Sequence, residues 1–325
     1  MSRKLFLTAF AVSLLTNPAV GAEILSGGVY GGAQESSDFL RDSYPSDWDA
    51  SDNGDPLDFE IGMRYFYSLG SSKLTVNGGS YSSNDQSHIV ELHARIDDNS
   101  TDTFLKGSFG YAAVTNGTYE TPEFIGVQTM NNGSIISYGG ADFGYMPFGN
   151  ADFRLGGFVG YQYLADNVDM GRSNYVTASG GGDSDQNAMN INALKLGVVA
   201  RAELADMIDL NIEAAVIPYA NISGTYGAFN LPNYAFGGNV FQQGSAGTIS
   251  GNLYGASGEA MIGFHPTEDI TLRVGGRVTY LTGDASISYT GREVGTPTNS
   301  QDFISEVSGL EFFRYGALLE LTARF

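Results

Sequence analysis

From residue 57 onward, apolar and polar side chains alternate with a period of two. In the first segment, Leu57 and Phe59 fall on one face, and Asp58 and Glu60 fall on the other. A period of two places one class of side chain on each face of a β-strand. The chain is therefore predicted to be all-β, with ten strands in total. The pattern returns at 86–96, 103–115, 134–146, 151–164, 191–203, 208–219, 251–264, 268–282 and at the C-terminal end.

Alternation alone fits both a soluble sandwich and a membrane barrel, but the lengths of the segments and connections favour the membrane. Segments of about ten residues or more are long enough to cross a bilayer as tilted strands. Short periplasmic turns and long external loops are typical of an outer-membrane barrel. We predict a transmembrane antiparallel up-and-down β-barrel at 57–325. The short connections are 97–102, 147–150, 203–207 and 266–268, and the long ones are 116–133, 165–190, 220–250 and 284–307.

The N-terminal residues 1–22 have the features of a secretory signal peptide. Arg3 and Lys4 precede a short apolar run, and small residues end the segment at Ala22, where cleavage is expected. Residues 23–56 are predicted to form an N-terminal extension with an acidic loop, and 23–33 could add a strand. The alternation is interrupted at 70–72, which indicates a bulge or a turn that divides the first segment. With both options the barrel would have twelve strands.

The composition excludes several classes of function. A formal net charge of −20 and a pI near 4.3 leave no basic tract for nucleic acid. The chain has no cysteine, so disulfides and thiolate metal sites are excluded. His88 and His93 fall on opposite faces of one segment, and His265 lies in a turn region. No metal site and no cofactor is therefore predicted.

The polar faces of the predicted strands should line the barrel lumen. Both signs of charge are present on them, which leaves two alternatives open. The charges could form a salt-bridge network that fills a narrow barrel, or an arginine-rich lining of a selective pore. The predicted lumen residues are Glu60, Arg64, Glu91, Arg95, Lys106, Asp142, Arg154, Lys195, Arg201, Glu213, Glu259, Arg273, Arg277, Arg314 and Glu320.

The long connection at 220–250 contains no Asp, Glu, His, Lys or Arg. Its aromatic residues are spaced by Gly, Asn, Gln and Ser, a composition that can form a contact surface for glycan, lipid A or another protein. Alternatively, the rings fold down over the barrel mouth as a lid. The aromatic residues are Tyr226, Phe229, Tyr234, Phe236 and Phe241.

The segment FEIGMRYFYSLGSSK at 59–73, followed by 88–95 and by FLKGSFGY at 104–111, resembles the start of omptin-like outer-membrane barrels. The segment GGFVGYQY at 156–163 and the closing strand extend this resemblance over 57–325. It implies a ten-stranded surface protease, in which an acidic pair and an aspartate–histidine pair on facing loops activate water. Glu120 and Glu123 could stand at the acidic position. The facing loop has no aspartate or histidine, so we carry over the fold and not the activity.

Three functions follow from these patterns. The first is a non-enzymatic outer-membrane barrel with a structural or loop-mediated binding role. The alternatives are a small ion- or solute-selective pore and a divergent surface peptidase that uses Glu120 and Glu123.

The expected partners are outer-membrane lipid and the barrel assembly machinery. The terminal Phe325 resembles the signal that this machinery reads. Lipopolysaccharide is a further candidate partner. The oligomeric state stays open.

Overall fold

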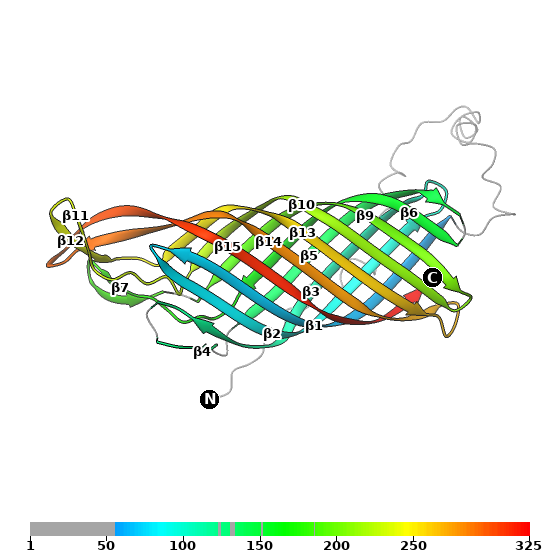
Figure 1. The fold of residues 1–325 in the computed structure, drawn as a ribbon, viewed down its shortest axis with the longest axis horizontal. Coiled ribbons are helices and arrows are strands. Elements are labelled where there is room, and N and C mark those ends of the chain that lie inside the picture. Colours follow the sequence, from blue (N-terminus) through cyan, green and yellow to red (C-terminus); the bar gives the residue numbers. More distant parts are fainter. Residues whose placement is uncertain (1–55, 123–124, 131–133, 151, 185) are drawn as a thin grey trace, which may run out of the picture. The chain divides into compact units, whose positions relative to one another are not determined.

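The computed structural model describes residues 56–122, 125–130, 134–150, 152–184 and 186–325. Ten long antiparallel strands close into a barrel, because β15 pairs with both β14 and β1 (Figure 1). This confirms the predicted all-β barrel and its strand number. The strands of the ring are β1 (Leu57–Val76), β2 (Gly79–Asp98), β3 (Thr103–Glu120), β5 (Ile135–Gly149), β6 (Phe153–Asn167), β9 (Ala188–Ala205), β10 (Ile208–Tyr226), β13 (Gly247–Phe264), β14 (Ile270–Glu293) and β15 (Thr296–Arg324).

Several predictions fall on parts of the chain that the structure does not describe. They are the signal peptide with its end at Ala22, the extra strand at 23–33, the acidic loop within 23–56, and Glu123. In the described part of the chain, no helix has the length and apolar character needed to cross a membrane.

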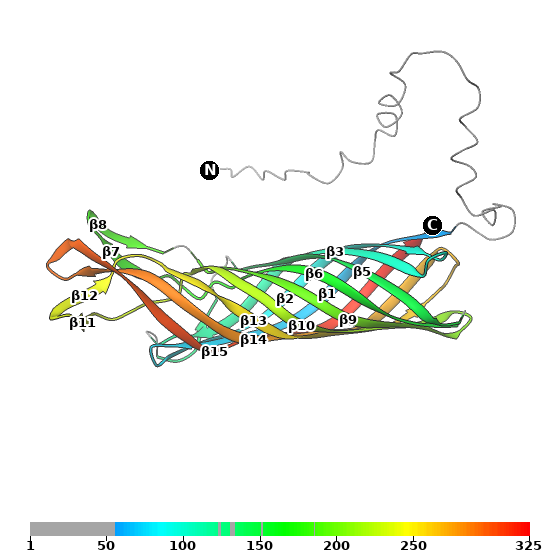
Figure 2. The same cartoon turned by 90° about the horizontal axis from the view of Figure 1, so that it is seen from above.

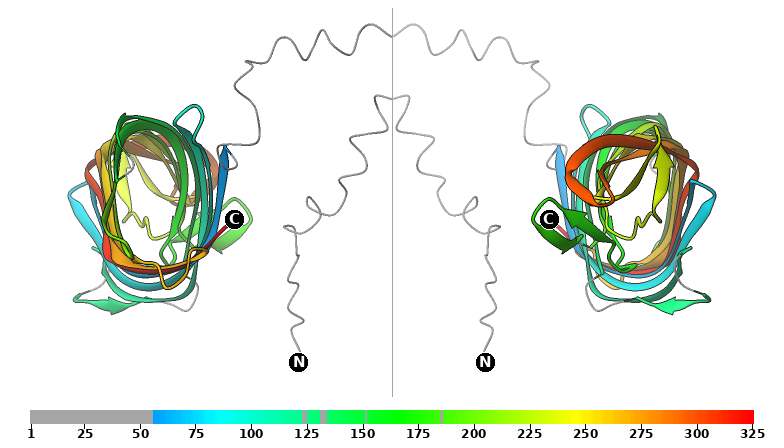
Figure 3. Two further views of the ribbon diagram at one scale, coloured as in Figure 1. Left: turned by 90° about the vertical axis from the view of Figure 1, so that its right-hand side faces the viewer. Right: turned by 90° about the vertical axis from the view of Figure 1, so that its left-hand side faces the viewer.

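The connections gather at two ends of the barrel, which we call the turn end and the loop end. The turn end has the connections 99–102, 206–207 and 265–269, residues 150 and 152 of the connection between β5 and β6, and Phe325. The loop end has the described residues of the connections 77–78, 121–134, 168–187, 227–246 and 294–295. Five short strands lie at the loop end (Figure 1 labels β4, and Figure 2 labels the other four), and the ring is seen end-on in Figure 3. They are β4 (Gln128–Thr129), β7 (Asn174–Thr177), β8 (Gly180–Asp183), β11 (Tyr234–Phe236) and β12 (Asn239–Gln243).

An apolar belt surrounds the half of the barrel nearer the turn end. Every strand of the ring contributes exposed large apolar side chains to it, for example Ile61 on β1, Val198 on β9 and Leu319 on β15. A continuous exposed apolar surface of this kind is unfavourable in water and favourable in lipid. Toward the loop end the belt finishes in tyrosines such as Tyr254 and Tyr280, as expected for rings placed at a membrane–water interface.

Beyond the belt, the two faces of each strand exchange polarity. On β13, outward Tyr254 is followed toward the loop end by outward Ser250, while the inward positions change from Glu259 to Leu253 and Ile249. The side-chain period does not change, so the backbone continues without interruption. The strands thus have apolar outer and charged inner faces in the belt, and polar outer and apolar inner faces beyond it.

The predicted loop at 284–307 is wrong because of this exchange. β14 continues to Glu293 and β15 begins at Thr296, so a tight connection joins them. Ile287, Tyr289 and Val307 in this region are buried on the inner face. The other three long connections are also shorter than predicted, since strands β3, β6 and β10 continue into them. The pattern of outward apolar residues ends at the border of the belt, whereas the strands continue beyond it toward the loop end.

The interruption predicted at 70–72 neither divides β1 nor shifts its pairing with β2, which is continuous from Leu57 to Val76. Inward positions simply change from polar Ser68 to apolar Leu74. A bulge does occur opposite, on β15, where the pairing with β1 shifts between Lys73 and Thr75. Gly309 lies there with φ of +61°, a conformation that favours glycine.

Candidate functional site

The barrel interior has two layers, a charged layer inside the belt and an apolar layer toward the loop end. In the charged layer, each residue predicted to line the lumen makes at least one ion pair with another described residue. Buried charges are tolerated when they are paired in this way. The charged layer therefore consists of one large network of ion pairs and several smaller groups.

Arg64 on β1 lies at the centre of this network. Its Nη1 is 3.0 Å from Glu91 Oε1 and 3.3 Å from Glu259 Oε1, and its Nε donates to Glu320. Arg277 joins the same group, with Nη1 2.8 Å from Glu91 Oε2 and Nη2 2.6 Å from Glu259 Oε2. Arg64 thus connects β1 with β13, and Arg277 connects β14 with β2, in addition to contacts with neighbouring strands. The charged layer therefore cross-links strands that do not pair with one another.

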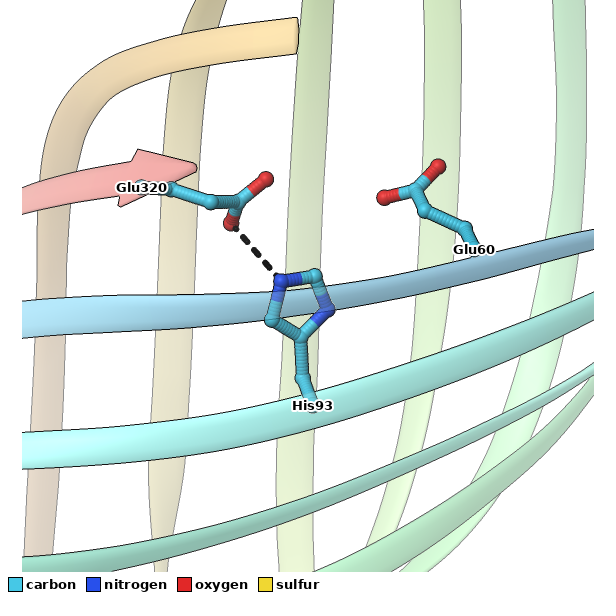
Figure 4. Close-up of side chains that lie close together, drawn as sticks. All are labelled: Glu60, His93 and Glu320. Carbon is cyan, nitrogen blue, oxygen red and sulfur yellow. Dashed lines mark ion pairs between the residues drawn. The ribbon is translucent and has the colours of Figure 1, made fainter. Parts of the chain in front are cut away.

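Arg273 continues the network toward the turn end. Its Nη1 donates to Glu60 at 2.9 Å and to Glu320 at 2.8 Å, and its Nη2 lies 3.2 Å from Asp209 Oδ2. Glu60 is on β1 and Glu320 is on β15, the strands whose pairing closes the barrel. His93 points toward both carboxylates from β2 (Figure 4).

Smaller groups of ion pairs complete the charged layer. Near the turn end, Arg95 pairs with Asp97 at 2.7 Å, and Arg201 lies 3.5 Å from the same carboxylate. The side chain of Arg154 pairs with Asp102 at 2.8 Å. Among the remaining pairs, Lys106 on β3 contacts Glu213 on β10 at 2.5 Å, and Arg314 on β15 contacts Asp166 on β6 at 3.1 Å, both across the lumen. Lys195 pairs with Asp142 at 2.7 Å and Arg314 with Asp85 at 2.9 Å, each across one intervening strand.

The apolar layer fills the lumen between the charged network and the loop end. Inner faces of the strands and residues of the loops, such as Val168, Met170 and Phe229, form one buried hydrophobic cluster. Buried polar side chains hold the loops over it. Gln243 donates through Nε2 to the Phe229 carbonyl at 3.1 Å, and Asn187 accepts the Ala228 N–H at 3.1 Å.

The five aromatic residues of the predicted loop at 220–250 divide between the two alternatives. Tyr226 and Phe229 are buried in the apolar layer, as a lid would require, and Phe241 is buried against Tyr234 and Phe303. Phe236 is 51% exposed, at the turn between β11 and β12. Tyr234 is partly buried among Phe241, Tyr289 and Phe303, and burial raises the pKa of its hydroxyl above the ordinary value.

The other candidates stand apart from the charged layer or at its border. Glu120 is exposed at the end of β3. His88 faces outward, where its Nδ1 lies 2.5 Å from the hydroxyl of Tyr65. His265 lies at the turn end, with Nε2 2.6 Å from Asp209 Oδ2 and Nδ1 3.0 Å from the Thr271 hydroxyl.

Sequence reasoning missed several members of the network. Tyr138 donates its hydroxyl to Glu91 at 2.5 Å, and Asp85 pairs with Arg314. Asp85 has the same parity along β2 as Glu91, so its inward position was readable once the strand was known to begin at Gly79. Tyr138 has the same parity along β5 as Asp142, so its inward position was also readable from the alternation.

Comparison with solved structures supports the barrel fold through one match with a TM-score above 0.5. No protein-family profile matches the chain, and no curated protein matches it in sequence. Among solved structures, the outer membrane protease OmpT from Escherichia coli is similar with a TM-score of 0.54 and 10% identity, over 83% of this chain and 97% of that one. The translocator domain of the autotransporter NalP from Neisseria meningitidis has a TM-score of 0.35 and 11% identity, and the match covers 85% of this chain and 90% of that one. An outer membrane channel from Pseudomonas putida F1 also has a TM-score of 0.35, with 15% identity, and the match covers 84% of this chain and 99% of that one.

Proposed function

We propose that this chain is an integral outer-membrane protein with a sealed, non-conducting and non-enzymatic barrel, which acts through a contact surface at its loop end. The filled interior is the observation that carries the proposal. The charged layer is paired, and the apolar layer lies above it. Within the described lumen, cavities lined by Arg277 measure about 50 and 70 Å³, room for a few water molecules each.

The outer-membrane location is supported by the barrel's outer surface. The apolar belt with tyrosines at its loop-side border suits a bilayer. The fold is that of outer-membrane barrels such as OmpT. Phe325 is exposed at the end of the last strand, where the barrel assembly machinery could reach it. Membrane lipid around the belt is the partner that this surface favours most directly, and lipopolysaccharide is a candidate in the outer leaflet.

The contact surface that we propose is the tip formed by β11, β12 and the connection between β14 and β15. It projects from the loop end (Figures 1 and 2). The N–H of Val294 donates to the carbonyl of Val240 at 2.8 Å, which joins the two hairpins. Phe236, Val240 and Val294 are exposed there, and Ile304 is 74% exposed on β15. Exposed apolar groups in a water-facing region are typical of surfaces that bind another molecule.

Planar-bilayer recording tests the seal. The refolded protein, verified as a folded barrel by heat-dependent gel mobility, is expected to give no discrete current steps, because ions would have to displace paired buried charges and cross the apolar layer. Salt-dependent current steps from verified barrels would contradict the sealed interior. In that case Arg273→Ala and Arg277→Ala would be examined for a change of ion selectivity, as the pore alternative requires.

Epitope insertion tests the location and the orientation. An epitope placed between Gly237 and Gly238, in the turn of the β11–β12 hairpin, should be detected by antibody on intact cells. The same epitope in the connection 99–102 should be detected only after the outer membrane is opened. Detection of the second epitope on intact cells would show that the turn end faces outward, and would remove the tip as a surface contact.

A further inference from the structure

Glu60, His93 and Glu320 bring three metal-ligating side chains together inside the barrel (Figure 4). One carboxylate oxygen of each glutamate and one ring nitrogen of His93 all lie within 4.8 Å of one another. The three residues come from β1, β2 and β15, which are neighbours because the barrel closes between its first and last strands. The group therefore spans the closing seam.

A glycine makes this arrangement possible. Gly62 on β1 pairs with His93 on one side and with Thr322 on the other. A Cβ atom at Gly62 would lie 2.3 Å from His93 Nε2 and 2.7 Å from Thr322 Oγ1. Because that atom is missing, the imidazole reaches across β1 toward β15.

The His93 ring makes only long contacts where it arrives. Its Nε2 is 3.5 Å from Glu320 Oε2 and 3.5 Å from Thr322 Oγ1, the outer limit of a hydrogen bond. The side chain is nevertheless 98% buried, at 2% relative exposure. A buried polar group normally has a close partner. Here Nε2 is directed toward Glu320 (Figure 4), at a distance longer than an ordinary hydrogen bond.

The charged side chains around the three residues include more carboxylates than arginines, so a bound cation would be favoured electrostatically. The connected ion pairs join Arg64, Arg273 and Arg277 to five carboxylates, Glu60, Glu91, Asp209, Glu259 and Glu320. The neighbouring group of Arg95, Arg201 and Asp97 reduces this excess of carboxylates without removing it. Arg273 donates to Oε1 of Glu60, so Oε2 of Glu60 is available to a metal. Uncompensated buried negative charge is costly, and a divalent ion would offset it.

An ion could reach the group from the turn end. A cavity of about 200 Å³ there is lined by Glu60 and Thr322. A smaller space of about 20 Å³ further in is lined by both Glu60 and His93. Glu60 thus stands between the cavity and the buried imidazole.

We propose that Glu60, His93 and Glu320 bind a divalent transition-metal ion, for which Zn²⁺ is the matching probe, and that this ion clamps the closing seam of the barrel. One imidazole nitrogen and two carboxylate oxygens form a ligand set that Zn²⁺ accepts. Metal–ligand bonds of about 2.0–2.1 Å in a tetrahedron separate ligand atoms by about 3.4 Å. His93 Nε2 and Glu320 Oε2 already have about this separation, at 3.5 Å. Glu60 would rotate toward them, and Glu320 Oε2 would bind the ion while it still accepts from Arg64 Nε.

Calorimetric titration of the purified barrel tests the site. The full-length protein as isolated from outer membranes, in detergent and stripped with EDTA, is expected to bind one Zn²⁺ per barrel. His93→Gln should weaken this binding at least about tenfold. His88→Gln is the matched control, since His88 lies on the same strand and faces outward. Zn²⁺ should also raise the temperature of the gel-mobility transition in the parent and the control, but not in His93→Gln.

Gly62→Ala is a second test that retains all three ligands. Its new methyl group displaces the imidazole, so Zn²⁺ binding should again weaken. Should His93→Gln fail to fold, Glu60→Gln replaces it, because Arg273 retains Glu320 and Asp209 as partners. The proposal is overturned if the parent binds no Zn²⁺, if His93→Gln or its replacement binds as the parent does, or if His88→Gln loses as much affinity as His93→Gln.

Discussion

Arg64→Ala is expected to lower the free energy of unfolding of the barrel by about 3–5 kcal/mol. Arg64 contacts Glu91, Glu259 and Glu320, and the side chains of Glu91 and Glu320 are fully buried. Removing the guanidinium leaves these buried carboxylates with fewer positive partners, which is the costly way to break a buried network. Denaturant titration of the protein folded into lipid vesicles would measure the change.

Arg324→Ala is the matched control for this prediction. Arg324 also pairs with a carboxylate, Asp58, at 2.6 Å, but its side chain is 54% exposed at the turn end. Exposed ion pairs contribute about 1 kcal/mol or less, so this variant should unfold almost as the parent does. Equal destabilisation by the two variants would mean that the loss of positive charge matters and the buried network does not.

Phe229→Ala is expected to destabilise the loop end by about 3–5 kcal/mol while the belt stays folded. Phe229 is 1% exposed and packs against Tyr289 with ring centroids 5.1 Å apart. Its loss leaves a cavity in the apolar layer beneath the connection 227–246. Limited proteolysis should then cut within that connection, whereas the heat-dependent gel shift of the barrel should change little.

Phe236→Ala provides the comparison, because Phe236 lies in the same connection and is largely exposed. It should leave the proteolysis pattern unchanged. If Phe229→Ala were also cut no faster than the parent, the buried polar contacts of Gln243 and Asn187 would be sufficient to hold the loops, and the ring would not be needed for the seal.

The fold was predictable within the belt, where outward side chains are apolar and inward side chains are polar. Outward residues such as Ile61 and Leu319 must be apolar to meet lipid, and the period of two then identifies the strand. The rule reverses beyond the belt, where Ile287 and Val307 point inward. The strand ends were therefore predicted too early, and the connection at 284–307 was read as a loop although the alternation continues through it.

The candidate site was less predictable, because its geometry depends on closure of the ring. Parity along the strands indicates which charges point inward, as for Glu60 and Glu320. It gives no information on which charges meet across the lumen, since residues 260 positions apart become neighbours only when β15 pairs with β1. The role of Gly62 as a gap between two neighbouring side chains also depends on this pairing, and glycine is too common in the chain for its position alone to indicate it.

The exchange of polarity along the strands means that one continuous sheet is stabilised against two different solvents. Near the turn end, the bilayer holds the barrel from outside, and the stabilising exchange is between lipid and apolar side chains. Near the loop end, water excludes apolar side chains into the interior, as in a soluble protein. A reagent that weakens the hydrophobic effect in water, such as urea, should therefore loosen the loop end first, and a change of lipid thickness should act first on the other half. The two halves of the barrel, on either side of the belt tyrosines, should therefore be destabilised by different changes of their surroundings.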